Sequence, residues 1–179
     1  RGDQCDACGG AFEQNLLIKP RCVNCGSNPQ LTSTRHWFFR LDRYEERLEE
    51  WLESREGWRD NVRNFSRGIV REGLPARSIT RDLEWGVPVP LEEAHDKVLY
   101  VWFDAPIGYI SFTREMFRAR GQENEWRSWW SDEDVEIVHF LGKDNIIFHA
   151  VIWPSMLLGH GDFRLPTSIP ANEYLNFKG

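Results

Sequence analysis

The sequence predicts an α/β fold with a small cysteine-rich lobe at its N-terminal end. Two apolar segments, 97–103 and 135–141, have the length and the aromatic and β-branched composition of buried strands. A stretch with helical periodicity follows each of them, and this alternation is typical of a parallel sheet covered by helices. All four cysteines lie within residues 1–25, outside the part that shows this alternation.

The composition indicates a soluble globular protein. Of the 179 residues, 41% are hydrophobic and 13% are aromatic, which is too rich for a disordered chain. The longest apolar runs, 98–103 and 146–158, are too short or too interrupted to span a bilayer, so we expect no membrane anchor. Because the N-terminus lacks the pattern of a secretory signal, we expect a cytoplasmic protein. The formal net charge of −6 argues against a surface dedicated to nucleic acid, although it leaves room for a local basic patch.

The four cysteines form two pairs with the spacing of a metal-binding knuckle. Two residues separate Cys5 from Cys8 and Cys22 from Cys25, and thirteen residues lie between the pairs. Two such pairs supply the four thiolates that a tetrahedral zinc ion prefers, and they leave the ion no open position, so we expect a structural Zn²⁺ site. Two disulfides, or an iron ion on the same thiolates, are the alternatives. We assign this lobe to residues 1–36.

Two helices and an irregular connection are expected next. In residues 41–55 the apolar side chains recur at helical spacing between glutamates and arginines, which predicts an amphipathic helix. A second helix is expected over residues 59–72, ending at Gly73. Two prolines and a glycine within residues 86–90 exclude a regular helix and predict an ordered loop or an edge strand. The side chains of the second helix that we expect to face inward are Val62, Phe65, Ile69 and Val70.

Two strand–helix units are expected in the last part of the chain. The strand 97–103 leads into a helix over residues 108–120, and the strand 135–141 leads into a helix over residues 145–158. A short helix over residues 124–130 is expected between the two units. The layout is therefore strand, helix, strand, helix.

Polar residues interrupt the apolar sequence at the end of each expected strand. The first strand is followed by DAPIGY at 104–109, and the second by GKDN at 142–145. Ligands of parallel α/β sheets bind where the carboxyl ends of the strands meet the helices that follow them. We therefore expect the functional site at these two segments.

Several segments together resemble the methionyl-tRNA synthetases of the archaeal and eukaryotic type. The segments, which follow a four-cysteine knuckle, are ITRDLEWGVPVP at 79–90, YVWFDAPIGYIS at 100–111, FLGKDNIIFHAVIWPSMLLG at 140–159 and ANEYLNFKG at 171–179. The resemblance covers essentially the whole chain. Other class I synthetases share the general architecture and the Gly-x-Asp turn, but not the Trp-x-Asp-Ala-Pro-Ile-Gly-Tyr motif.

The resemblance implies a Rossmann-like class I nucleotide-binding domain, split by a connective peptide that carries the zinc knuckle. Residues 1–36 would be the knuckle part of that peptide. Residues 37–179 would be the second half of the catalytic domain, with a helical segment over 41–73 and strand–helix units over 97–179.

The activity implied by the resemblance is ATP-dependent conversion of L-methionine to methionyl adenylate, followed by transfer to tRNA(Met), with Mg²⁺ bound to ATP. Gly142 and Asp144 would bind the ribose of the adenosine, and Arg81 would be a catalytic residue. The residues that would line the methionine side-chain pocket are Trp102, Pro106, Tyr109 and His149, with Asn145 and Trp153 beside them.

The chemistry of these residues suits a flexible, uncharged thioether, which a pocket selects by shape, aromatic contact to sulfur and a few polar groups. Each residue also has a purely structural interpretation: Trp102 as a core aromatic, His149 as a satisfied core histidine, Asp144 as a helix cap. A zinc-ribbon module that binds nucleic acid or protein explains the cysteines equally well, but it does not explain the two polar segments. A sister synthetase for another aliphatic amino acid is disfavoured by the Trp-x-Asp-Ala-Pro motif.

Two phosphate-handling signatures of the family do not occur in the sequence, namely a His-x-Gly-His turn and a Lys-Met-Ser-Lys-Ser loop. We therefore expect an internal fragment of a longer synthetase. Residues 1–179 alone are expected to form no adenylate.

Overall fold

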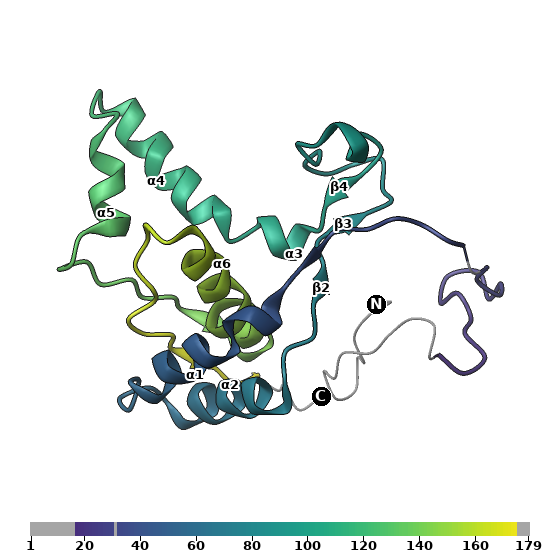
Figure 1. Cartoon of the computed structure of the whole chain (residues 1–179), viewed down its shortest axis with the longest axis horizontal. Coiled ribbons are helices and arrows are strands. Elements are labelled where there is room, and N and C mark those ends of the chain that lie inside the picture. Colours follow the sequence, from purple (N-terminus) through teal and green to yellow (C-terminus); the bar gives the residue numbers. More distant parts are fainter. Residues whose placement is uncertain (1–16, 31, 175–179) are drawn as a thin grey trace, which may run out of the picture. The chain divides into compact units, whose positions relative to one another are not determined.

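The computed structural model describes residues 17–30 and 32–174, and Figure 1 shows the course of the chain. The chain divides into two compact units, residues 1–35 and 36–179. Among the helices of the described ranges, none has both the length and the apolar character needed to cross a membrane.

The helical part of the second unit begins with a 3-10 turn, Leu41–Tyr44, which leads into α1 (Glu45–Glu53). Helix α2 (Asp60–Glu72) packs against α1, and Gly73 ends it with a φ of +93°. Both expected helices and the glycine stop are therefore confirmed.

The inward face of α2 differs from the expectation at one position. Val62 and Val70 are buried and Ile69 is partly buried, but Phe65 is 48% exposed, and Ser66 is fully buried instead. On a helix with 3.6 residues per turn, Val62, Ser66 and Val70 follow one another on one face, whereas Phe65 lies at the edge of that stripe.

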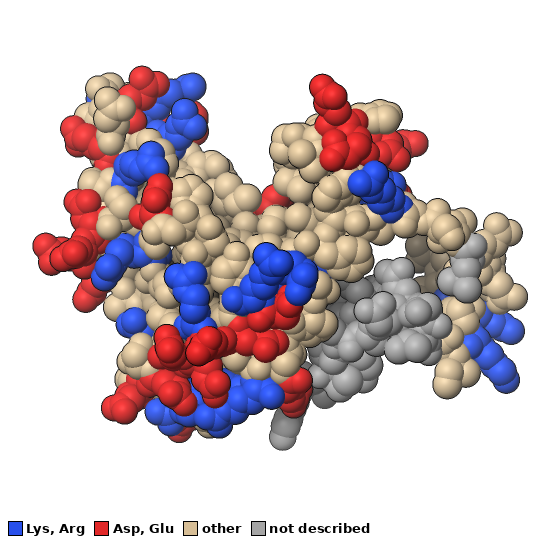
Figure 2. Space-filling model, in the orientation of Figure 1, with Lys and Arg blue, Asp and Glu red and all other residues tan. Residues whose placement is uncertain are grey.

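The outer surface of α1 and α2 carries both signs of charge. Arg67 pairs with Glu53 at 3.3 Å, and Arg71 pairs with Glu49 at 3.1 Å. Figure 2 shows basic and acidic side chains interspersed over this face. Such exposed pairs contribute little stability, and this face offers no large basic surface for nucleic acid.

Two short antiparallel pairs follow. Strand β1 (Phe38–Phe39) pairs with β2 (Arg77–Ser78), and β3 (Thr80–Arg81) pairs with β4 (Val98–Leu99). Pro88 forms an isolated antiparallel bridge with Val98. The proline-containing segment is thus the ordered edge that the sequence predicted.

The expectation of one strand over residues 97–103 is wrong beyond Leu99. Helix α3 (Val101–Asp104) begins directly after Tyr100, whose carbonyl oxygen accepts the backbone N–H groups of Phe103 and Asp104. Both ends of the run are apolar, but for different reasons. Val98 is buried in the β3–β4 pair, whereas Phe103 belongs to α3 and packs on the main core. A short apolar run does not by itself distinguish strand from helix.

Helix α4 (Ile107–Ala119) follows α3 with Pro106 at its N-cap. Proline suits the start of a helix because its φ is already helical, and here it is −63°. Gly121 has a φ of +71° just beyond the helix, a left-handed conformation that favours glycine. The expected short helix is present as a 3-10 turn, Glu125–Arg127, and α5 (Ser128–Ser131).

The second expected strand is also shorter and less buried than predicted. Strand β5 (Leu141–Gly142) pairs in parallel with β6 (Ala171–Asn172), and Val138 forms a parallel bridge with Ser168. Successive strand residues face opposite sides, so Ile137 and His139 are buried while Val138 and Phe140 are exposed, Phe140 to 82%. The expected burial on both faces is wrong for the described structure.

The strand arrangement corrects the expected parallel layout. Among the described strands, β5 and β6 form a parallel pair, whereas β4 pairs antiparallel with β3. The segments 104–109 and 142–145 therefore do not lie at the carboxyl ends of two neighbouring parallel strands. Helix packing brings them together instead, because α3 contacts the helical segment that follows β5.

That helical segment has three parts. A 3-10 turn, Lys143–Asn145, leads to a π-helical turn, η6 (Phe148–Ile152), and then to α6 (Trp153–His160). Ala150, Val151 and Ile152 join the core that α1 and α2 complete. A π-turn inside a helix is rare and often occurs at functional sites, because it rotates the side chains that follow it.

Candidate active site

The site forms where α3 and the start of α4 meet η6. Trp102 comes from α3, and its indole ring stacks on the ring of Phe148 from η6, with 5.3 Å between centroids and 28° between planes. Trp102 is 46% exposed, so it is not the core aromatic that composition alone suggests. One face of this ring is held by Phe148, and the residue remains accessible to a ligand.

Tyr109 and His149 form the polar centre of the site. Tyr109 comes from the first turn of α4 and His149 from η6, and the phenol oxygen lies 2.8 Å from Nε2 of the imidazole. The other ring nitrogen of His149, Nδ1, lies 3.0 Å from the backbone carbonyl oxygen of Asn145.

These two contacts determine the direction of the hydrogen bonds. A carbonyl oxygen only accepts, so Nδ1 of His149 must carry a proton and donate it to Asn145. Burial lowers the pKa of His149 and raises the pKa of Tyr109, so both groups are neutral near pH 7. Nε2 of neutral His149 then accepts the hydroxyl proton of Tyr109. The phenol oxygen therefore presents lone pairs, not a proton, to a bound ligand.

Two further rings complete what we call the ring cluster, which consists of Tyr109, His139, His149 and Trp153. Trp153 is buried, and its ring centroid is 6.5 Å from that of Tyr109. His139 is also buried, with its centroid 4.9 Å from Tyr109 and 5.2 Å from His149. Burial, and then the nearby His149, lower the pKa of His139 to about 4. The cluster is thus a largely uncharged aromatic wall with a few polar atoms.

Pro106 supports this wall from the start of α4. It is buried three residues before Tyr109, where it fixes the backbone at the junction of α3 and α4. The structure therefore brings together five of the six residues assigned to the methionine pocket around the ring cluster, by direct contact or as chain neighbours, and Trp102 joins them through Phe148.

The turn that precedes η6 holds the two residues assigned to ribose binding. Gly142 ends β5, and a Cβ atom placed on it would lie 2.8 Å from Oδ1 of Asp144, so a larger residue there would force this carboxylate to move. The Asp144 carboxylate is exposed. Between them, Lys143 donates to Oε2 of Glu173 at 2.6 Å, which raises the pKa of Lys143 and lowers that of Glu173. Because the turn continues into η6, the two sets of candidate residues are adjacent along the chain.

Arg81 lies on β3, and hydrogen bonds to nearby backbone carbonyl oxygens fix its guanidinium group. One terminal nitrogen donates to the carbonyl oxygens of Ser78 and Thr80, at 3.3 and 2.7 Å. The guanidinium lies over the ring of Tyr100, 3.9 Å from its centroid. Tyr100 is two residues before Trp102, so Arg81 is linked to the site through this ring.

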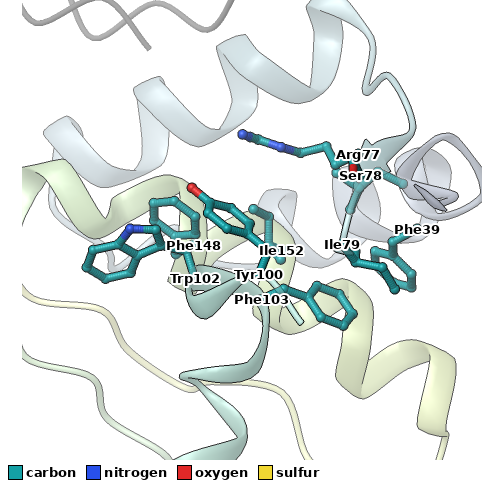
Figure 3. A pocket seen from close by; sticks show the side chains of 10 residues that line it. Phe39, Arg77, Ser78, Ile79, Tyr100, Trp102, Phe103, Phe148 and Ile152 are labelled. Carbon is teal, nitrogen blue, oxygen red and sulfur yellow. The ribbon is translucent and has the colours of Figure 1, made fainter. Parts of the chain in front are cut away.

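An apolar pocket adjoins the stacked pair of Trp102 and Phe148. Figure 3 shows it between β1, β2, α3 and η6, with the rings of Tyr100 and Phe103 among its walls. Leu41 and Ile152 of the main core also line this pocket, so it lies between the core and the stacked pair.

In the first unit, the described cysteines form a tight turn. The N–H of Gly26 donates to the carbonyl oxygen of Cys22 at 2.8 Å, with a φ of +71° at Gly26 that favours glycine. The thiols of Cys22 and Cys25 are free and exposed. Hydrogen bonding from Ser27 lowers the pKa of Cys25 to about 7, which favours the thiolate that binds metal ions.

The other two predicted ligands, Cys5 and Cys8, lie outside the described residues. Across the described ranges, no group of three His, Cys, Asp or Glu side chains is placed to hold a metal ion. The local turn at Cys22 and Cys25 nevertheless suits one half of a four-thiolate site.

Comparison with known proteins identifies the family. The model of the family described as "tRNA synthetases class I (M)" matches residues 1–179. The chain belongs to this family. The expected class I synthetase fold is accordingly confirmed.

Relatives in this family are methionine–tRNA ligases. The enzyme from Methanopyrus kandleri is 53% identical over 179 residues, which are 100% of this chain and 26% of that protein. The enzyme from Thermoplasma volcanium is 50% identical over 179 residues, again 100% of this chain and 33% of that protein. The chain thus spans about a third of the length of these relatives, or less.

A solved structure agrees with these relatives. The methionyl-tRNA synthetase of Mycobacterium tuberculosis bound by methionyl-adenylate superposes with a TM-score of 0.67 at 33% identity. The match covers 87% of this chain and 29% of that one.

Two residues of the site were missed from sequence. Phe148 lies in an apolar helix pattern that marks it as core, and its stack with Trp102 depends on packing between elements. His139 carried a signal, since it is a titratable residue inside an otherwise apolar predicted strand. A titratable residue whose pKa is strongly perturbed by burial is a functional-site candidate.

Proposed function

We propose that the protein is a methionine–tRNA ligase, which activates L-methionine with ATP and transfers it to tRNA(Met). The observation that carries this proposal is the ring cluster with Trp102 beside it, in a chain about half identical to methionine–tRNA ligases over its whole length. Residues 37–179 would be the second half of the catalytic domain. Residues 1–36 would be the knuckle part of the connective peptide.

The exposed indole of Trp102 and the ring of Tyr109 would contact the methionine side chain. Sulfur is polarisable and makes favourable contacts with aromatic rings, so these rings would favour a thioether over a branched aliphatic chain. Trp153 and Pro106 are buried and would limit the depth of the pocket. His149 would hold the phenol of Tyr109 in place through the 2.8 Å hydrogen bond.

Gly142 and Asp144 would bind the ribose of ATP next to this pocket. An exposed carboxylate can accept protons from both ribose hydroxyl groups. Arg81 carries a fixed positive charge and would stabilise the charge that develops near the α-phosphate, and Mg²⁺ would arrive bound to ATP. Catalysis would then consist of positioning and charge neutralisation, without a covalent enzyme intermediate.

The knuckle would hold one structural Zn²⁺ ion through Cys5, Cys8, Cys22 and Cys25. The described turn supports this assignment, since both of its thiols are exposed and Cys25 has a lowered pKa of about 7. When bound, the ion would supply folding energy to this lobe.

ATP–pyrophosphate exchange tests the proposal. The full-length protein would be supplied with methionine, leucine, isoleucine, valine and cysteine in separate reactions. We expect exchange with methionine far above the other four. Exchange that is fastest with another amino acid, or absent from folded protein, contradicts the proposal.

Trp102→Ala tests the pocket itself. Because Trp102 is 46% exposed, its loss should leave the fold intact while methionine binding weakens by at least tenfold. Trp129→Ala is the matched control, since Trp129 is 60% exposed and lies 5.6 Å from the ring of Phe117. Isothermal titration with methionine should separate the two variants, and equal affinities would remove Trp102 from the pocket.

A further inference from the structure

His139 occupies a position that packing alone does not explain. It lies on the inward face of the segment before β5, where its backbone N–H donates to the carbonyl oxygen of Ser168 at 3.0 Å. The side chain is 7% exposed and contacts both Tyr109 and His149. Its Nε2 atom is buried and has no hydrogen-bond partner within the described part of the chain.

A buried polar atom without a partner destabilises a fold, because it gives up its hydrogen bond to water and receives nothing in return. A phenylalanine would fill a similar volume among the same rings without that loss. Native proteins leave few such atoms unpaired, and a catalytic role or a bound group is one recognised reason for those that remain. The nitrogen of His139 is therefore better explained by a partner that arrives with the substrate.

The hydrogen bonds of Tyr109 and His149 indicate which donors in the ring cluster remain available to a ligand. The proton of Tyr109 goes to His149, and the proton on Nδ1 of His149 goes to Asn145. Neither group has a proton left for a ligand, so the donors that remain in the ring cluster are Nε2 of His139 and the indole N–H of Trp153, both buried and unpaired within the described part of the chain. A neutral His139 with its proton on Nε2 can donate one, and a thioether sulfur can accept it.

We propose that His139 is a specificity-determining residue of the amino-acid pocket, whose Nε2 atom donates a hydrogen bond to the thioether sulfur of the substrate, directly or through one bound water. This inference rests on the proposed function and names a residue that decides its selectivity. The sulfur is what distinguishes methionine from norleucine, which has a methylene group in its place. Recognition by His139 thus acts on that one difference.

The test compares exchange with methionine and with norleucine in the full-length protein. His139→Phe keeps an aromatic ring and removes both nitrogens, whereas His139→Gln keeps a polar group near the position of Nε2. His95→Phe is the control, because His95 is an exposed histidine outside the ring cluster. The quantity measured is the ratio of kcat/KM for methionine to kcat/KM for norleucine.

We expect His139→Phe to lower this ratio about fivefold, the effect of losing one neutral hydrogen bond. His139→Gln should recover part of the loss, and His95→Phe should leave the ratio unchanged. The melting temperature of His139→Phe should equal or exceed that of the wild type, since the unpaired nitrogen is gone. A merely structural role would lower stability and leave the ratio as it was.

An unchanged ratio in His139→Phe overturns the inference, as does an equal loss of activity with both amino acids. If that variant does not fold, His139→Leu supplies the same comparison with a smaller side chain. A wild-type protein that exchanges with neither methionine nor norleucine overturns the proposed function, and with it this inference. Methionine exchange by the wild type together with an unchanged ratio rejects the role of His139 alone.

Discussion

Lowering the pH from about 7.5 to about 5.5 should destabilise the protein through its buried histidines. Burial lowers the pKa of His139 from 6.5 to about 4, and it lowers the pKa of His149 as well. The unfolded chain takes up a proton on each imidazole as the pH falls below 6.5, whereas the folded protein resists that uptake. Their contribution to stability is therefore complete above pH 6.5 and, for His139, is lost as the pH falls toward about 4.

The size of the effect follows from linkage. Between pH 7.5 and pH 5.5, the shift of His139 alone amounts to about 1.3 kcal/mol of unfolding free energy. His149 shifts in the same direction and adds to this loss. In His139→Phe the part due to His139 disappears, so the wild type should lose about 1.3 kcal/mol more than the variant over this range.

Urea unfolding followed by tryptophan fluorescence measures this difference. All nine tryptophans lie in residues 36–179, so the signal reports on the unit that contains His139. Carboxylates titrate equally in both proteins and cancel in the comparison. His95→Phe should behave like the wild type, because His95 is exposed. Equal pH dependence in wild type and His139→Phe would refute the reasoning.

Two further predictions concern the site and the knuckle. Tyr109→Phe leaves the buried Nε2 of His149 without a donor, so the unfolding free energy should fall by about 1–2 kcal/mol in the same urea assay. An unchanged urea midpoint would show that the hydrogen bond contributes nothing. Cys25→Ser removes one of the four proposed thiolates and should lower the bound zinc from about one ion per chain to nearly none, measured by elemental analysis after gel filtration. Full retention of zinc would place the ion elsewhere.

Much of the fold could be predicted from local sequence. The helix Asp60–Glu72 was expected because its apolar residues recur every three to four positions, and because Gly73 can take the positive φ that ends it. The stop of α4 at Gly121 is a signal of the same kind. These signals depend only on the residues of one segment, so they are the same whichever segments pack against it.

The residues of the candidate site were found from motifs, and their contacts were not. Tyr109 and His149 are 40 positions apart, and nothing in either segment encodes the 2.8 Å bond between them. The predicted parallel strands would have explained their proximity, but packing of α3 and α4 on η6 brings them together instead. The two predicted segments do lie together, although the expected reason for it was wrong.

The extent of each strand and the burial of each polar atom depended on the tertiary structure. The apolar pattern of residues 97–103 fits a strand and a helix equally well. The partners β3 and η6, which come from elsewhere in the chain, decide where the strand ends and the helix begins. The contacts of His139 with Tyr109 and His149 exist only in the folded structure. Local sequence carries backbone preference and residue chemistry, whereas burial, hydrogen-bond direction and pKa arise from neighbours that only folding supplies.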